Sequence, residues 1–189
     1  MPTKIKTYLK PALVASIVFG TLMAFFISGA EKMPPLTGSM QKFILNQRVT
    51  SAPPIAFRDP DGNEKVISDF RGQALLINFW ATWCAPCIRE LPSLARLQTE
   101  KKSSKFTVLA VSTDLKGKKI AAPFLERLNL TSLPLYLDSE MEFARALGVK
   151  TLPTTILIDR AGNVVGSLAG LAEWDSAEAL ALIDYFRRQ

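Results

Sequence analysis

The stretch NFWATWCAPCIRELP, Asn78 to Pro92, contains both cysteines of the 189-residue chain, Cys84 and Cys87. The preceding residues 74–80 form a nearly continuous apolar run, which is typical of a strand buried on both faces. Residues 84–102 carry an apolar stripe with helical spacing. The sequence therefore predicts a cysteine pair at the junction between a buried strand and the start of a helix.

The cysteine pair fits three kinds of site: a metal clamp, a structural disulfide or a reversible redox pair. A zinc site needs four ligands, and the chain has no histidine and no third cysteine. A structural disulfide between Cys84 and Cys87 would close a tiny loop and remove little entropy from the unfolded state. The redox pair is therefore the favoured interpretation.

The expected position at a helix N-terminus assigns a different role to each cysteine. Free backbone N–H groups and the positive end of the helix dipole stabilise a thiolate, so we expect Cys84 to be the attacking nucleophile. Cys87, one turn later, would resolve the mixed disulfide. Pro86 between them stiffens the first helical turn, where its missing N–H has no intrahelical partner.

Glu90 and Trp83 are further candidates beside the cysteines. Glu90 follows Cys87 by three residues, so the two lie close together on one helical face. A buried carboxylate there could have a raised pKa and carry a proton, whereas an exposed one would merely favour the helix dipole. Trp83 could form a partner-docking surface next to the nucleophile. The residues alone leave both questions open.

The rest of the chain alternates strands and helices, which predicts an α/β layer fold over residues 51–189. A β-hairpin is expected over 55–67 around the turn DPDGN. Further strands are expected at 106–113, 135–137, 155–158 and 164–168, and helices at 120–128, 140–147 and 174–186. Residues 33–50, which contain Pro34, Pro35 and Gly38, are expected to be a linker.

The N-terminal residues 1–32 predict a membrane anchor. Three lysines precede an uncharged run from Pro11 to Ala30, and about 20 residues span a hydrocarbon core of roughly 30 Å. Cleavage after Ala30 by a signal peptidase is the alternative. The lysines place the N-terminus in the cytoplasm and the rest of the chain outside, which in a bacterium means the periplasm.

The net charge of +6 does not by itself indicate a binding partner. Residues 1–32 supply four lysines against one glutamate, or +3 of this total. Lysine clusters at 101–105 and 116–119 could favour an anionic membrane surface or simply be solvated. No motif supports nucleic-acid binding, and no nucleic-acid partner is expected.

The cysteine stretch and the segment TLPTTILID, Thr151 to Asp159, resemble the TlpA/ResA/CcmG branch of the thioredoxin superfamily. Its members are membrane-anchored extracytoplasmic thiol:disulfide oxidoreductases, and the resemblance covers residues 53–189. It implies a thioredoxin fold with an added N-terminal β-hairpin and a central insertion. The patterns over 55–67 and 117–137 accommodate these two additions.

The resemblance also implies partners. The CxxC pair would reduce disulfides in client proteins such as apocytochrome c or copper-site assembly proteins, in cytochrome c maturation or cytochrome oxidase assembly. Electrons would come from a membrane thiol transporter. No cofactor is expected beyond the redox-active disulfide Cys84–Cys87.

The resemblance adds roles for individual residues. Pro153 matches a proline, usually in the cis form, that faces the CxxC and beside which an incoming peptide pairs; an ordinary turn proline is the alternative. With Trp83 and Pro86 it makes up the expected substrate-binding set. A functional glutamate at this spacing favours the acid/base role of Glu90. Asn78 stands where thioredoxin carries a buried aspartate, and an asparagine cannot exchange a proton.

Two other functions use the same scaffold. Peroxiredoxins place a threonine or serine three residues before a lone peroxidatic cysteine, and this chain has Ala81 there. A copper chaperone would be expected to use a histidine beside its cysteines, and the chain has none.

Overall fold

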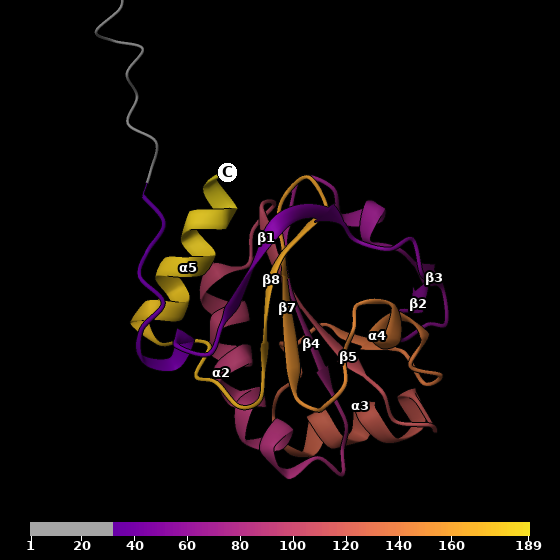
Figure 1. Ribbon diagram of the computed structural model, residues 1–189. Helices are drawn as coiled ribbons and strands as arrows, with labels where there is room; N and C mark the ends of the chain where they lie inside the picture. Colours follow the sequence, from indigo (N-terminus) through magenta and orange to yellow (C-terminus); the bar gives the residue numbers. More distant parts are fainter. Residues whose placement is uncertain (1–31) are drawn as a thin grey trace, which may run out of the picture. The chain divides into compact units, whose positions relative to one another are not determined.

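The computed structural model describes residues 32–189 and arranges their strands in one sheet with helices on both faces (Figure 1). The anchor expected over 1–32 lies almost entirely outside the described residues. Within 32–189, no helix is both long and apolar enough to cross a membrane.

The strands are β1 (Ile44–Ser51), β2 (Phe57–Arg58), β3 (Glu64–Lys65), β4 (Ala74–Trp80), β5 (Phe106–Ser112), β6 (Leu135–Leu137), β7 (Thr154–Ile158) and β8 (Asn163–Ala169). The helices are α2 (Ala85–Lys101), α3 (Lys118–Arg127), α4 (Glu142–Ala146) and α5 (Ala177–Arg188), with 3₁₀ turns η1 (Gly38–Met40) and η2 (Ile67–Phe70). The predicted strands and helices from residue 74 onward are confirmed, with boundaries within about three residues.

Strand β4 lies in the interior of the sheet, whose order is β1-β8-β7-β4-β5-β6-β2-β3. It pairs in parallel with β5 and antiparallel with β7. All of its residues are buried, as the apolar run predicted, because helices cover the sheet above and below it. The carboxyl ends of β4 and β5 therefore emerge side by side, and the cysteine loop follows β4.

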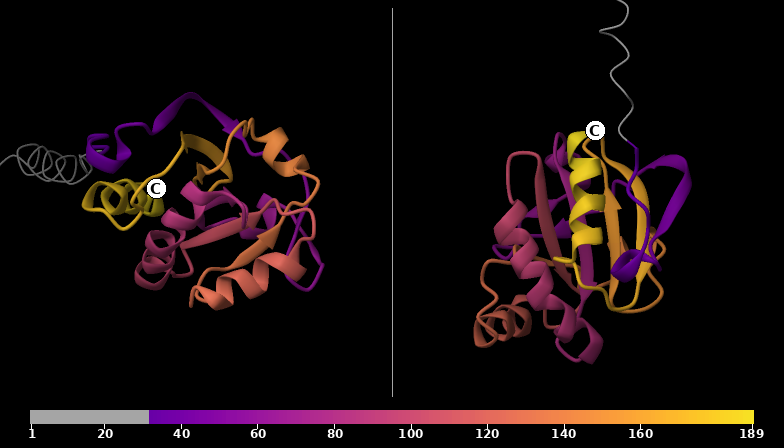
Figure 2. Two further views of the ribbon diagram at one scale, coloured as in Figure 1. Left: turned by 90° about the horizontal axis from the view of Figure 1, so that it is seen from below. Right: turned by 90° about the vertical axis from the view of Figure 1, so that its left-hand side faces the viewer.

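Alternate residues of β4 face two different cores. Leu76 and Trp80 belong to the cluster shared with α2 and α5, whereas Ile77 and Phe79 belong to the cluster that contains Phe143 of α4. The right-hand view of Figure 2 looks onto the face covered by α2 and α5. Asn78 is two residues from both Leu76 and Trp80, so its side chain points to the same face as theirs. It thus lies beneath the helix that carries the cysteines.

The predicted hairpin exists as β2 and β3, and β2 also pairs with β6. Phe57 attaches it to the sheet: its ring stacks on Phe143 at a centroid distance of 4.7 Å and meets Tyr136 edge-on at 5.4 Å. Such aromatic pairs add to the stabilisation that comes from burying the ring.

The predicted linker over 33–50 is wrong for most of its length. Met40 and Phe43 are buried in the core under α5, and β1 pairs antiparallel with β8 as an edge strand. Residues 33–189 form one compact unit. Sequence patterning missed β1 because seven of its eight residues are exposed, so backbone pairing rather than an apolar face holds it to the sheet.

Candidate active site

The Cys84–Cys87 disulfide lies at the start of α2, with an S–S distance of 2.00 Å. Cys84 is the N-cap residue, and its Sγ accepts a hydrogen bond from the backbone N–H of Cys87 at 3.3 Å. This is the predicted arrangement, in which an otherwise unpaired N–H of the first turn points at the sulfur. Cys84 retains 5% exposure and Cys87 only 1%, so solvent reaches Cys84 more readily.

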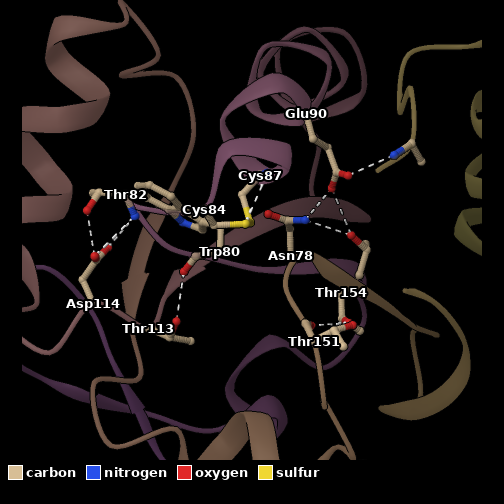
Figure 3. The surroundings of a disulfide bond; sticks show 12 residues. Asn78, Trp80, Thr82, Cys84, Cys87, Glu90, Thr113, Asp114, Thr151 and Thr154 are labelled. Atoms are coloured by element: carbon tan, nitrogen blue, oxygen red, sulfur yellow. Dashed lines mark hydrogen bonds between the residues drawn. A yellow bond between two sulfur atoms is a disulfide. The ribbon is translucent and has the colours of Figure 1, made fainter. Parts of the chain in front are cut away.

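Glu90 lies one turn beyond Cys87 and is completely buried. Its Oε1 accepts hydrogen bonds from Asn78 Nδ2 at 2.6 Å and from Thr155 Oγ1 at 3.4 Å, and its Oε2 accepts one from the backbone N–H of Ala172 at 3.0 Å (Figure 3). Asn78 Nδ2 also bonds Thr155 Oγ1 at 2.9 Å. The four residues come from β4, α2, β7 and the segment before α5, so the network joins the sheet to α2 and to the segment that leads into α5.

Burial raises the pKa of Glu90 to about 7. The indole of Trp174 and the hydrogen bonds from Ala172, Thr155 and Asn78 oppose this rise. The desolvation of a carboxylate disfavours its charged form, and here it outweighs all of the donors. Glu90 therefore exchanges a proton near neutral pH.

Sequence reasoning singled out Glu90 and Asn78 separately but did not predict their hydrogen bond, and it missed Thr155 and Ala172. Thr155 is a polar residue within the apolar strand TTILI, fully buried on the sheet. A buried hydroxyl in such a strand signals a buried hydrogen-bond partner. Ala172 contributes its backbone N–H, and no side-chain pattern can reveal that.

The Leu152–Pro153 peptide bond is cis, as the resemblance predicted. Thr154 pairs with Phe79 in the β4–β7 register. This pairing places the buried Pro153 beside the end of β4, from which the chain enters the cysteine loop.

Comparison with known proteins agrees with this geometry. The model of the AhpC/TSA family matches residues 49–167. The thiol-disulfide oxidoreductase ResA of Geobacillus kaustophilus is 37% identical over 121 residues, which cover 64% of this chain and 68% of the relative. ResA of Bacillus cereus is 28% identical over 154 residues, or 82% of this chain and 88% of the relative.

A crystal structure of a Chlorobium tepidum protein assigned as thiol:disulfide interchange protein DsbE superposes with a TM-score of 0.65. It is 29% identical and covers 76% of this chain and 99% of its own. The chain belongs to the ResA-like thiol-disulfide oxidoreductases of the AhpC/TSA family. The thioredoxin fold expected from the resemblance is confirmed, and the enzyme class is thiol:disulfide oxidoreductase.

In this ResA-like oxidoreductase, a buried carboxylate holds the loop before Cys84. Asp114 Oδ2 accepts the backbone N–H of Thr82 at 3.0 Å and the hydroxyl of Ser112 at 2.9 Å, and Oδ1 accepts the hydroxyl of Thr82 at 2.8 Å. Sequence reasoning missed Asp114, although it follows the buried strand β5. The neighbouring parallel strand β4 leads to the cysteines, so this position was bound to lie beside the cysteine loop.

Trp83 projects from that loop with 72% of its surface exposed. Pro86 occupies the first turn of α2 and is partly exposed. Leu115, next to Asp114, is 86% exposed. The docking role of Trp83 and Pro86 stays a prediction. Leu115 is a further exposed apolar residue near the cysteine loop.

Proposed function

We propose that this oxidoreductase is a reductant of disulfides in extracytoplasmic client proteins, with Cys84 as nucleophile and Cys87 as resolving thiol. The observation that carries the proposal is the disulfide at the N-terminus of α2 beside a buried carboxylate. Clients of suitable chemistry are proteins with paired cysteines, such as apocytochrome c or copper-site assembly proteins.

The reduced protein would start the reaction through Cys84. Its thiolate attacks one sulfur of the client disulfide, the client S–S bond breaks, and the leaving client thiolate takes up a proton. Cys84 is the candidate because it is the more exposed residue of the pair and its Sγ accepts a hydrogen bond from the backbone N–H of Cys87. The thiolate form is the one that attacks.

Cys87 completes the exchange. It gives up its proton and attacks the Cys84 sulfur of the mixed disulfide, and the second client sulfur leaves as a thiolate that is then protonated. Two electrons pass to the client, and the protein ends with the Cys84–Cys87 disulfide. Glu90, one turn away with a pKa of about 7, is the proposed acceptor of the Cys87 proton.

The surroundings of the cysteines favour a reductant over an oxidant. Strong oxidants stabilise their thiolate heavily. The two residues between the cysteines, Ala85 and Pro86, carry no charge, and the buried acid nearby is a carboxylate. An ionised Glu90 would destabilise a neighbouring thiolate.

The three lysines and the uncharged run after them support, as part of this proposal, a periplasmic location with an inner-membrane anchor at 1–32. A membrane thiol transporter would then return the disulfide to the dithiol, because the client reaction consumes two electrons per turnover. The redox pair needs no other cofactor for this cycle.

The proposal is tested by the equilibrium potential of the couple and by trapping. Cys87→Ser should accumulate a mixed disulfide with oxidised apocytochrome c, while Cys84→Ser, the matched control, should not. The wild-type potential should lie near that of thioredoxin, about −270 mV, and far from that of a dedicated oxidant, about −120 mV. An oxidising potential, or no adduct through Cys84, would refute the proposal.

A further inference from the structure

The amide oxygen of Asn78 is a buried acceptor that finds no hydrogen-bond donor within the described part of the chain. Asn78 is 1% exposed, and both hydrogens of its amide are used, in the bonds to Glu90 and Thr155. Its Oδ1 accepts no hydrogen bond from any group of residues 32–189. Figure 3 shows the nitrogen directed at Glu90 and the oxygen directed at the disulfide.

An unpaired acceptor in a protein core costs free energy, because its hydration is lost without replacement. The bonds to Glu90 and Thr155 fix the amide, so the oxygen cannot turn elsewhere for a donor without breaking them. The disulfide offers it none, since neither sulfur carries hydrogen. Reduction adds two electrons and two protons to the pair and thereby creates a thiol donor at the place that Oδ1 faces.

We propose that Asn78 accepts a hydrogen bond from the Cys87 thiol in the reduced protein and so acts as a positioning residue for thiol–disulfide exchange. The inference rests on Cys84–Cys87 being the redox couple of the proposed function. Cys87 is the donor because it precedes Glu90 by one turn, and Asn78 bonds Glu90. The sulfur of Cys84, in contrast, accepts a hydrogen bond from the backbone N–H of Cys87 and is therefore the one suited to be the thiolate.

Two consequences follow from a bond made only by the protonated thiol. The dithiol becomes more favourable relative to the disulfide, which raises the reduction potential. The pKa of Cys87 also rises, because the bond favours the neutral form. Cys87 then stays protonated until the mixed disulfide forms.

The titratable groups of this network are the two cysteines on α2 and Glu90. Asn78 from β4, Thr155 from β7 and Trp174 before α5 do not titrate in this range. Asn78 carries no proton itself. It holds the Cys87 thiol near the carboxylate that takes the proton when Cys87 attacks.

The test compares two substitutions of Asn78. Asn78→Leu removes the acceptor, and Asn78→Asp keeps an oxygen toward Cys87. A thiol is a weak donor, so Asn78→Leu should lower the dithiol-to-disulfide equilibrium constant about three- to tenfold, equivalent to about 15–30 mV toward more negative potential. The pKa of Cys87 should fall by about half a unit to one unit. Asn78→Asp should keep the potential above that of Asn78→Leu and the Cys87 pKa at or above the wild-type value, because a carboxylate oxygen accepts the thiol hydrogen and, when ionised, also disfavours the thiolate.

A direct readout is the S–H stretching band in Cys84→Ser, where Cys87 is the one remaining thiol. This band should lie at the frequency of a hydrogen-bonded thiol when position 78 is Asn or carries Asn78→Asp. It should shift to the frequency of a free thiol in Asn78→Leu. A free-thiol band with Asn78 in place would overturn the proposal even if Asn78→Leu failed to fold.

Glu90 and Thr155 provide the controls. In a Glu90→Gln background, Asn78→Leu should still shift the S–H band. If the shift were lost, Asn78 would act only through the Glu90 carboxylate, and the inference would be refuted. Thr155→Val, which removes a neighbouring bond but leaves Oδ1, should leave the band in place. If the wild type cycles reversibly but Asn78→Leu changes neither band nor potential, the inference fails while the proposed function stands.

Discussion

At the scale of single residues, Glu90 has the most unusual environment near the disulfide. A fully buried carboxylate normally needs a cation or a metal beside it. Here the hydrogen bonds that Glu90 accepts from residues 32–189 come from neutral donors, on Asn78, Thr155 and Ala172. Its raised pKa is the result, and it makes the stability of the protein depend on pH.

We expect the oxidised protein to lose stability as pH rises toward 8. The folded state holds the Glu90 proton up to a pKa of about 7, whereas the unfolded chain releases it near 4.5. The folded form therefore binds more protons between these values, so this stabilisation is complete below pH 4.5 and is lost as pH rises through 7. The expected decline from pH 5 to pH 8 is about 2–3 kcal/mol.

Urea unfolding of the oxidised protein at several pH values measures this decline. Glu90→Gln should make the stability nearly independent of pH over the same range, because glutamine does not ionise. Glu126→Gln, at an exposed position of α3, is the matched control and should retain the wild-type decline. A Glu90→Gln curve parallel to the wild type would contradict the assigned pKa.

Single residues also show which features of the site could be predicted from the sequence. The CxxC spacing and the lack of histidine were enough to predict a redox pair, and i,i+3 spacing was enough to place Glu90 beside Cys87. The partners of Glu90 come from β7 and from the backbone N–H of Ala172, and the cysteine loop is held through Thr82 by Asp114, which follows β5. Such contacts depend on strand order, which local patterns do not encode.

At the scale of elements, β4 could be predicted from local sequence patterns and β1 could not. Strand β4 is buried on both faces, so its apolar run predicted it directly. Strand β1 is exposed along nearly its whole length and is joined to the sheet by its pairing with β8. An edge strand of this kind carries no apolar alternation, and its polar residues resemble those of a linker.

Gly166 is what allows β1 to approach β8. It pairs with Leu45, and a Cβ at position 166 would collide with the carbonyl oxygen of Ile44 and lie 2.6 Å from the ring of Phe43. Gly166→Ala should therefore destabilise the protein by about 1–3 kcal/mol, the usual cost of overpacking. It should also increase hydrogen exchange along β1.

Urea unfolding and amide exchange check this expectation. Ser167→Ala, the neighbouring position on β8, is the control and should change stability by less than about 0.5 kcal/mol. Unaltered stability and exchange in Gly166→Ala would mean that β1 is not held against β8 as described.

At the scale of the whole molecule, the fold gathers the reactive disulfide and two exposed apolar side chains at one end of the sheet. Trp83 precedes Cys84 directly, and Leu115 follows Asp114, whose carboxylate bonds Thr82. The loops that carry Trp83 and Leu115 are thus joined by partly buried hydrogen bonds. Solvent-exposed apolar groups on fixed loops next to a reactive centre suit the docking of a protein rather than of a small thiol.

This arrangement makes Trp83→Ala a test of client recognition. Exposed tryptophans at interfaces are frequent hot spots, so kcat/KM for oxidised apocytochrome c should fall about tenfold or more. The rate with oxidised glutathione, which is too small to use the docking surface, should change less than about threefold, since the variant leaves Cys84 and its N–H donor in place. Stopped-flow oxidation of the reduced enzyme measures both rates.

Val49→Ala provides the comparison for Trp83→Ala, because Val49 on β1 is 83% exposed and distant in the sheet order from the cysteine loop. It should leave both rates unchanged, which would show that loss of an exposed apolar side chain alone does not impair the enzyme. An equal fall with both substrates in Trp83→Ala would instead place the tryptophan in the exchange chemistry. No fall with apocytochrome c would remove Trp83 from its docking surface, since burial of so large an exposed ring cannot be thermodynamically silent.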